Sequence, residues 1–149
     1  NGDDTIYAGD GDDNILGGNG NDVINGNAGS DNIKGGDGND ILNGNEAGDI
    51  IDGGEGDDQI FGGIGNDILT DGKGSDILDG GIGNDILILT KETGASSSID
   101  TINYFNPNED RIILRVDYRS PVNFYTVQKM MSQKLEIFYD EKLGRFFRA

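Results

Sequence analysis

A nine-residue repeat fills the first 88 residues and limits what they can fold into. An Asp recurs every nine residues without a break, and a large aliphatic residue follows each Asp two places later. Gly stands two places before each Asp, except where Ala47 replaces it. The ten aspartates are Asp4, Asp13, Asp22, Asp31, Asp40, Asp49, Asp58, Asp67, Asp76 and Asp85. A short period kept over ten copies is typical of a solenoid, in which each repeat stacks on its neighbours and buries a shared core.

Each repeat predicts a glycine-rich turn followed by a short strand. The six turn residues are rich in Gly, which adopts positive φ at no steric cost. Of the three residues that follow, the middle one is always aliphatic, which places one side chain in a core. Two repeats then complete one coil, so repeats n and n+2 stack at the ~4.8 Å spacing of neighbouring strands. The sequence therefore predicts an all-β parallel coil in which the aspartates stack in columns.

The composition changes near Leu89. Residues 1–88 hold 24 of the 26 Gly, 20 acidic residues and two basic ones. Residues 89–149 hold 8 acidic and 9 basic residues and two Gly. We therefore predict two parts, a repeat array over residues 1–88 and a C-terminal capping segment over residues 89–149.

Composition also excludes several classes of function. The chain has no His and no Cys, so it has no zinc finger, thiol nucleophile or Ser-His-Asp triad. A net charge of −17 argues against binding nucleic acid or an anionic membrane, and no aliphatic run is long enough for a transmembrane segment. The start, from Asn1 to Asp4, does not resemble a signal peptide, which predicts a fragment or export by a route that needs none.

Electrostatics predict that the stacked aspartates bind a cation. Bare carboxylates at ~4.8 Å repel each other by about 3.5 kcal/mol at an effective dielectric of 20. Ten buried aliphatic side chains cannot offset both this repulsion and the entropy lost by ordering 88 residues, so we expect a disordered chain without metal. A hard dication between two stacked carboxylates turns their repulsion into a net attraction, because both carboxylates bind it. A cage of oxygen ligands suits Ca²⁺ better than Mg²⁺. We therefore predict the repeat aspartates as side-chain ligands of about six to eight calcium ions.

The cleanest copies, residues 17–25 and 53–61, read GGNGNDVIN and GGEGDDQIF. They resemble the calcium-binding nonapeptide G-G-x-G-x-D-x-U-x of RTX (repeats-in-toxin) proteins. The resemblance implies a right-handed parallel β-roll whose turn carbonyls complete each calcium site, shared between repeats n and n+2. The implied carbonyl ligands are Gly17, Gly18, Gly20, Gly35, Gly36, Gly38, Gly53, Gly54, Gly56, Gly62, Gly63, Gly65, Gly80, Gly81 and Gly83. Local departures at Ala8, 27–28, 45–48 and Asp71 put individual sites in doubt.

The other acidic residues of the array are predicted to be solvated. The turn carboxylates in this group are Asp3, Asp10, Asp12, Asp37, Glu46, Glu55 and Asp57, and the strand-end carboxylates are Asp52 and Asp79. Two sets of outward aliphatic residues are spaced by eighteen, which predicts exterior columns that residues 89–149 would cover. These columns are Ile50, Ile68 and Ile86, and Ile64 and Ile82.

After the array, residues 99–105 and 106–114 alternate as two strands around a turn. They resemble the D-x-I-x-x-F-x-x-x-x-D-x-I-x-L cap of serralysin-type proteases and of the R-modules of mannuronan C5-epimerases. Asp100 and Asp110 are candidates for a further calcium site, for a turn role or for pairing with Arg. Residues 135–148 predict a hairpin with Gly144 near its turn, whereas residues 122–134 fit a helical turn or a strand equally.

The RTX resemblance implies a secreted bacterial protein that uses a type I secretion apparatus, stays unfolded at low intracellular calcium and folds outside the cell. No carboxylate pair stands apart from the repeat register and no His-like base exists, which argues against catalysis by this chain, so we predict no catalytic residues and no cofactor beyond calcium. Two alternatives stay open, a secreted adhesin and an extracellular module that binds anionic polysaccharide through calcium or arginines. The arginines in question are Arg111, Arg115, Arg119, Arg145 and Arg148.

Overall fold

The computed structural model describes residues 1–91, 100–116, 137–140 and 145–148. The chain divides into two compact units, Asn1–Asp117 and Tyr118–Ala149. Each unit is described by itself below.

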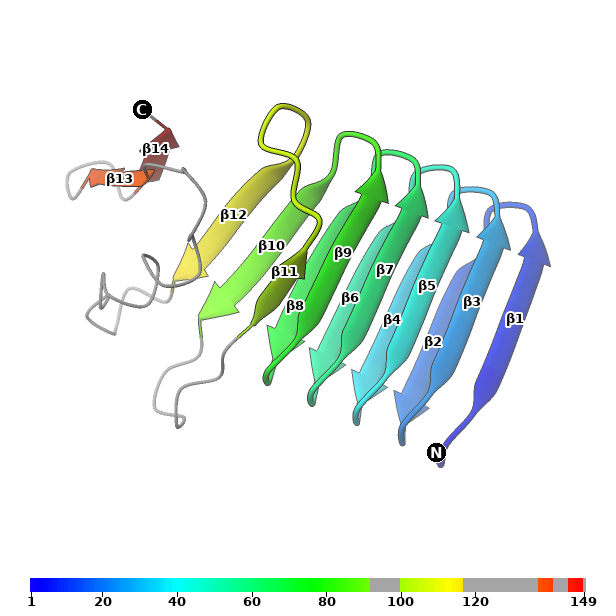
Figure 1. Cartoon of the computed structure of the whole chain (residues 1–149). Coiled ribbons are helices and arrows are strands. Elements are labelled where there is room, and N and C mark those ends of the chain that lie inside the picture. Colours follow the sequence, from blue (N-terminus) through cyan, green and yellow to red (C-terminus); the bar gives the residue numbers. More distant parts are fainter. Residues whose placement is uncertain (92–99, 117–136, 141–144, 149) are drawn as a thin grey trace. The chain divides into compact units, whose positions relative to one another are not determined.

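The described part of the first unit forms two parallel sheets whose strands alternate along the chain (Figure 1). One sheet has the order β1-β3-β5-β7-β9-β11 and the other the order β12-β10-β8-β6-β4-β2. The strands are β1 (Thr5–Asp10), β2 (Asn14–Asn19), β3 (Val23–Ala28), β4 (Asn32–Asp37), β5 (Ile41–Glu46), β6 (Ile50–Glu55), β7 (Gln59–Ile64), β8 (Ile68–Lys73), β9 (Ile77–Ile82), β10 (Ile86–Lys91), β11 (Thr101–Asn103) and β12 (Arg111–Val116).

Neighbouring strands in each sheet are offset by eighteen residues within the array. Ile6 pairs with Ile24, and Ile24 with Leu42. This register confirms that two repeats complete one coil. The aliphatic residue of each repeat points between the sheets and forms the core, and those with no exposed surface are Ile24, Ile33, Leu42, Ile51, Ile60, Leu69 and Leu78. The predicted all-β parallel β-roll is confirmed.

The strands are longer than predicted. Each array strand has six residues and runs through the first glycines of the following repeat, so the prediction of six-residue turns and three-residue strands was wrong in extent. In β3, both Ile24 and Gly26 are buried because they lie two places apart and face the same side. A Gly at this second inward position lets the extended backbone continue where no side chain fits.

The first unit extends past residue 88. Strand β10 crosses the predicted boundary, and β11 and β12 pair in parallel with β9 and β10. Ile102 lies beside Leu78 and Ile112 beside Leu87, so the inward aliphatic columns continue. The composition changes near Leu89, but aliphatic residues still alternate into the core beyond it. This alternation, and not the composition, decides where the coil ends.

The two exterior aliphatic columns are in register. Ile50 pairs with Ile68 and Ile68 with Ile86, while Ile64 pairs with Ile82. Within the described part of the first unit, Ile50, Ile64 and Ile82 are exposed. The cover predicted from residues 89–149 stays a prediction, because much of that segment lies outside the described residues.

The second unit contains β13 (Ile137–Asp140) and β14 (Arg145–Arg148), which pair antiparallel. This pairing confirms the predicted hairpin, while Gly144 and residues 122–134 lie outside the described residues. Within the parts of the chain that the structure describes, there is no helix with the length and apolar character that a membrane crossing requires.

Candidate metal sites

The repeat aspartates form two hydrogen-bonded columns, one at each edge of the roll. The backbone N–H of Asp22 donates to Oδ1 of Asp40 at 2.8 Å, and that of Asp40 donates to Oδ1 of Asp58 at 2.8 Å. The same bond recurs from Asp4 to Asp22, Asp13 to Asp31, Asp31 to Asp49, Asp49 to Asp67, Asp58 to Asp76 and Asp67 to Asp85. The predicted stacking of turn aspartates is therefore present, with Oδ1 fixed by the coil before.

The second carboxylate oxygen points into the protein without a donor. Oδ2 is buried and has no hydrogen-bond partner in Asp13, Asp22, Asp31, Asp40, Asp49, Asp58, Asp67 and Asp85. Asp22 and Asp58 are each 1% exposed, whereas Asp4, in the first turn, is exposed. A buried carboxylate oxygen without a partner is strongly unfavourable. This orphan oxygen is the feature that a cation would satisfy.

A small cradle lies beside each orphan oxygen. A Cβ built on Gly26 would approach both Asp31 Oδ2 and the Gly44 carbonyl oxygen more closely than 3.0 Å. Gly17, Gly35, Gly44 and Gly62 have the same surroundings, each with a carbonyl oxygen from the next coil. Two oxygens thus converge on a space that any side chain would fill. A hard cation with oxygen ligands, such as Ca²⁺, fits this donor set.

The carbonyl oxygens of four predicted ligands lie at cradles, those of Gly35, Gly53, Gly62 and Gly80, and Gly17 lines a cradle. That these first-position glycines bind calcium stays a prediction. Sequence reasoning missed Gly26 and Gly44, because their repeats depart from the pattern at other positions. The second- and fourth-position glycines that were predicted as ligands all have positive φ, namely Gly18, Gly20, Gly36, Gly38, Gly54, Gly56, Gly63, Gly65, Gly81 and Gly83. Their carbonyls as ligands stay a prediction.

Burial makes these carboxylates reluctant to ionise. Desolvation, followed by the charge of stacked neighbours, raises the pKa of Asp58 to about 7 and the pKa values of Asp49 and Asp67 to about 6. Burial also raises the pKa of Asp40 and Asp85. Protons or a cation at these carboxylates would therefore stabilise the folded array.

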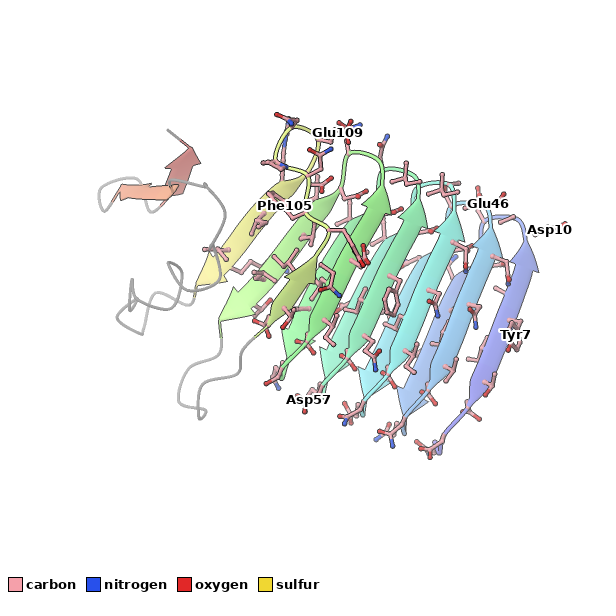
Figure 2. The ribbon with its side chains drawn as sticks, viewed as in Figure 1. Tyr7, Asp10, Glu46, Asp57, Phe105 and Glu109 are labelled. Carbon is pink, nitrogen blue, oxygen red and sulfur yellow. The ribbon has the colours of Figure 1, made fainter. Side chains whose placement is uncertain are left out.

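Some carboxylates predicted to be solvated also hold the coils together. Asp3, Asp12 and Asp57 are exposed, but each Oδ1 accepts a backbone N–H from the residue eighteen places later, at 2.8 Å. The recurrence of Asp or Asn directly before the repeat Asp was the signal for this second ladder. Figure 2 shows Asp57 in a turn at one end of the strands, and Asp10 and Glu46 at the other end, where β1 and β5 terminate.

Other surface carboxylates have local partners. Glu55 forms an ion pair with Lys73, and Asp37 accepts a hydrogen bond from Asn19 Nδ2 at 3.2 Å. Asp52 and Asp79 lie at outward strand positions and are half-buried, which is less solvated than predicted.

Asp100 and Asp110 continue the two columns beyond the repeats. The N–H of Asp76 donates to Asp100 Oδ1 at 3.2 Å, and that of Asp85 donates to Asp110 Oδ1 at 3.2 Å. Asp110 Oδ2 also accepts the N–H of Asn106 at 2.7 Å, which gives it a turn role. Asp100 follows Asp76 by 24 residues and Asp110 follows Asp85 by 25, so neither residue fits the nine-residue period.

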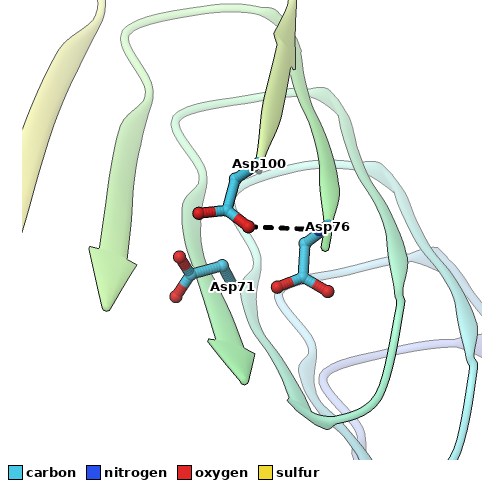
Figure 3. Close-up of side chains that lie close together, drawn as sticks. All are labelled: Asp71, Asp76 and Asp100. Atoms are coloured by element: carbon cyan, nitrogen blue, oxygen red, sulfur yellow. Dashed lines mark hydrogen bonds between the residues drawn. The ribbon is translucent and has the colours of Figure 1, made fainter. Parts of the chain in front are cut away.

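One group of carboxylates differs from the rest. Asp71, at the first position of its repeat, lies with Asp76 and Asp100, and each contributes one oxygen to a set within 4.8 Å of one another (Figure 3). The resemblance had marked Asp71 as a doubtful position, and the structure places its side chain beside a repeat Asp.

Comparison with known proteins gives one family. A family model for the RTX calcium-binding nonapeptide repeat (4 copies) matches residues 1–33, 16–51, 25–60, 34–69 and 52–87. A search of curated proteins found no match. A similar solved structure is the solution structure of the AlgE6R3 subunit from the Azotobacter vinelandii mannuronan C5-epimerase, with 37% identity and a TM-score of 0.48. That alignment covers 52% of this chain and 46% of the other, so less than half of that chain's length is matched.

Proposed function

The chain belongs to the family of RTX calcium-binding nonapeptide-repeat proteins, and from this we propose that it is a calcium-dependent folding and stabilising module of a secreted bacterial protein. By itself the module is non-catalytic. One observation carries the proposal: the inward carboxylate oxygen of successive repeats is buried without a hydrogen-bond partner, beside a carbonyl oxygen of the next coil.

The module's own residues account for the dependence on calcium. From Asp22 to Asp67, each repeat Asp uses Oδ1 to fix the coil before it, which leaves Oδ2 directed at the cradle. When calcium is bound, it supplies the positive charge that lets these carboxylates stay ionised in the interior. Because the cradle is built from two successive coils, it exists only in the folded chain, so binding free energy becomes folding free energy.

The stability that calcium binding adds is large enough to switch the chain from unfolded to folded. At free calcium about tenfold above a site's dissociation constant, each site adds about 1.4 kcal/mol of stability. Several sites in a column then add an amount comparable to the whole stability of a small domain, about 5–15 kcal/mol. About six to eight ions of this kind separate an unfolded calcium-free chain from a folded loaded one.

The switch supports a role in export. A chain that stays unfolded at low intracellular calcium can pass a type I secretion apparatus, and millimolar calcium outside then folds it. Weak sites of the extracellular type match that difference in concentration. The folded roll would stabilise the protein to which it belongs.

Far-ultraviolet circular dichroism tests the proposal. In chelator we expect a disordered spectrum, and millimolar CaCl₂ should restore the β signal while equal MgCl₂ should not, since Mg²⁺ keeps its waters and requires a smaller octahedral cage. An identical folded spectrum in chelator and in calcium would overturn the proposal.

A second candidate function is binding of extracellular polysaccharide. The outer face of one sheet carries Tyr7, Asn25, Asn43 and Phe61 in one column of paired residues. Tyr7 is 71% exposed, and Figure 2 shows it on β1. Amide and aromatic side chains in a row suit hydrogen bonding to and stacking on sugars. Calorimetric titration of the calcium-loaded chain with alginate-like and neutral glycans tests this, and no heat with either would leave only the folding role.

A further inference from the structure

The outer face of the sheet β1-β3-β5-β7-β9-β11 carries almost no charge, although the chain has a net charge of −17 (Figure 1). Each strand directs its first and third side chains outward, and parallel pairing sets them in two columns. The first-position column, from Thr5 to Thr101, is uncharged. The third-position column holds Tyr7, Asn25, Asn43, Phe61, Asp79 and Asn103, with Asp79 as its one charged member.

The amide groups in the middle of this column are not used to hold the coils together. In the turns, by contrast, Asn21 and Asn39 each accept a backbone N–H from the next coil, at 2.8 and 2.9 Å. Asn25 is half-buried, and its side-chain amide makes no hydrogen bond with the described residues. Asn43, also half-buried, donates to the Ile24 carbonyl at 3.4 Å and has a free amide oxygen among those residues. Both amides are therefore available to a ligand.

Aromatic rings flank the two amides. Tyr7 pairs with Asn25, and Phe61 pairs with Asn43, so the column runs ring, amide, amide, ring. Tyr7 is 71% exposed, as Figure 2 shows on β1, and Phe61 is half-buried. At the strand spacing of ~4.8 Å, the strands that carry the two rings lie about 14 Å apart. The face thus offers two apolar platforms with hydrogen-bonding groups between them, a combination suited to recognition surfaces.

This combination identifies the chemistry of the partner. Aromatic rings stack on the apolar faces of sugar rings, and amides bind hydroxyl groups as donors and acceptors. An anionic polymer would be repelled by the net charge of −17, and no outward residue of these described strands is Lys or Arg. An apolar protein surface would bury the Asn25 and Asn43 amides without partners, which is unfavourable. An uncharged, hydroxyl-rich polymer meets neither obstacle.

We propose that this face binds a linear, uncharged polysaccharide that runs across the strands. Tyr7 and Phe61 stack on sugar rings, and Asn25 and Asn43 bind the hydroxyl groups between them. The inference specifies the ligand class of the second candidate function and rests on the proposed function, because these residues share a column only after the repeats have coiled. Since the polysaccharide binds only the folded chain, it should also lower the calcium concentration at which the chain folds.

Calorimetric titration of the calcium-loaded whole chain tests the proposal. The probes are three uncharged polymers, soluble β-glucan, galactomannan and xyloglucan, and one anionic polymer, hyaluronan. We expect binding of at least one uncharged polymer, with an affinity that added salt does not change, because no ion pair forms. Binding of none of the three, or of hyaluronan alone, would overturn the proposal.

Matched variants locate the binding face. Phe61→Ala removes a platform, and Asn25→Asp keeps the size of the side chain but adds a charge and removes the amide donors. Each should weaken the dissociation constant at least about tenfold. Leu16→Ala is the control, because Leu16 holds the same strand position on β2 as Tyr7 on β1 and is 68% exposed. It should bind as the wild type does. Wild-type affinity in Phe61→Ala or in Asn25→Asp would contradict this site.

Circular dichroism in calcium shows whether each variant folds. If Phe61→Ala does not, Asn25→Asp decides the question, because it changes only one outward polar group. Failure of the proposed function is distinguishable from failure of this inference. In the first case the wild type folds equally in chelator, and in the second it still needs calcium to fold but binds no uncharged polymer.

Discussion

The backbone N–H of Asp40 donates to Oδ1 of Asp58, eighteen residues later, at 2.8 Å. Asp40 Oδ1 in turn accepts the N–H of Asp22 at 2.8 Å. Each repeat Asp inside a column is thus joined to the coil on either side, while its other oxygen stays available for a cation. A change at one such residue should be felt by both neighbours.

Asp40→Ala should therefore weaken the calcium response cooperatively. The variant loses a cradle and leaves the Asp22 N–H without its acceptor, which costs about 1–3 kcal/mol when the group stays buried. Circular dichroism as a function of calcium should show a higher midpoint and a shallower transition. Asp10→Ala, at the exposed end of β1, is the control and should match the wild type. An unchanged midpoint in Asp40→Ala would show that the columns do not bind calcium.

Ala47→Gly should stabilise the loaded chain. Ala47 has φ of 75°, a left-handed conformation that costs a residue with a Cβ roughly 1–2 kcal/mol and that Gly adopts freely. After the greater entropy of Gly in the unfolded chain is subtracted, we expect a gain of about 1 kcal/mol in thermal or urea unfolding. Ala28→Gly is the matched control, because Ala28 does not have positive φ, and it should destabilise. A loss of stability in Ala47→Gly would contradict this turn conformation.

Gly44→Ala should damage one cradle. The new Cβ would crowd Asp49 Oδ2 and the Gly62 carbonyl oxygen, so the backbone has to shift or the ion has to leave. We expect one calcium ion fewer per chain, counted by equilibrium dialysis, and a higher calcium midpoint for folding. Lys34→Ala, at an exposed position of β4, is the control and should keep the wild-type calcium stoichiometry. Wild-type calcium stoichiometry in Gly44→Ala would place the ions elsewhere.

Acid should partly replace calcium in folding. Burial raises the pKa of Asp58 to about 7 and those of Asp49 and Asp67 to about 6, above the ordinary 3.8 of the unfolded chain. A raised carboxylate pKa means that the folded state binds protons more tightly, so this contribution to stability is full below pH 3.8 and is lost as the pH rises through 6 to 7. In chelator, β signal should therefore increase between about pH 7 and pH 4. A calcium-free spectrum that does not change over that range would contradict the burial of these carboxylates.

The repeat sequence alone determined the all-β roll, the eighteen-residue coil and the stacking of the aspartates, because period, inward aliphatic residues and glycine turns all act locally and agree with one another. Ile24 and Asp22 take their predicted places for this reason. The tertiary structure alone decided the rest. The contacts of Asp71 and Asp100 depend on where the pairing of β8 with β10 ends and on which segment returns to the column, and both follow from pairing between distant segments. The spacing of residues along the chain carries no signal for such contacts, because Asp100 reaches Asp76 across a step outside the period.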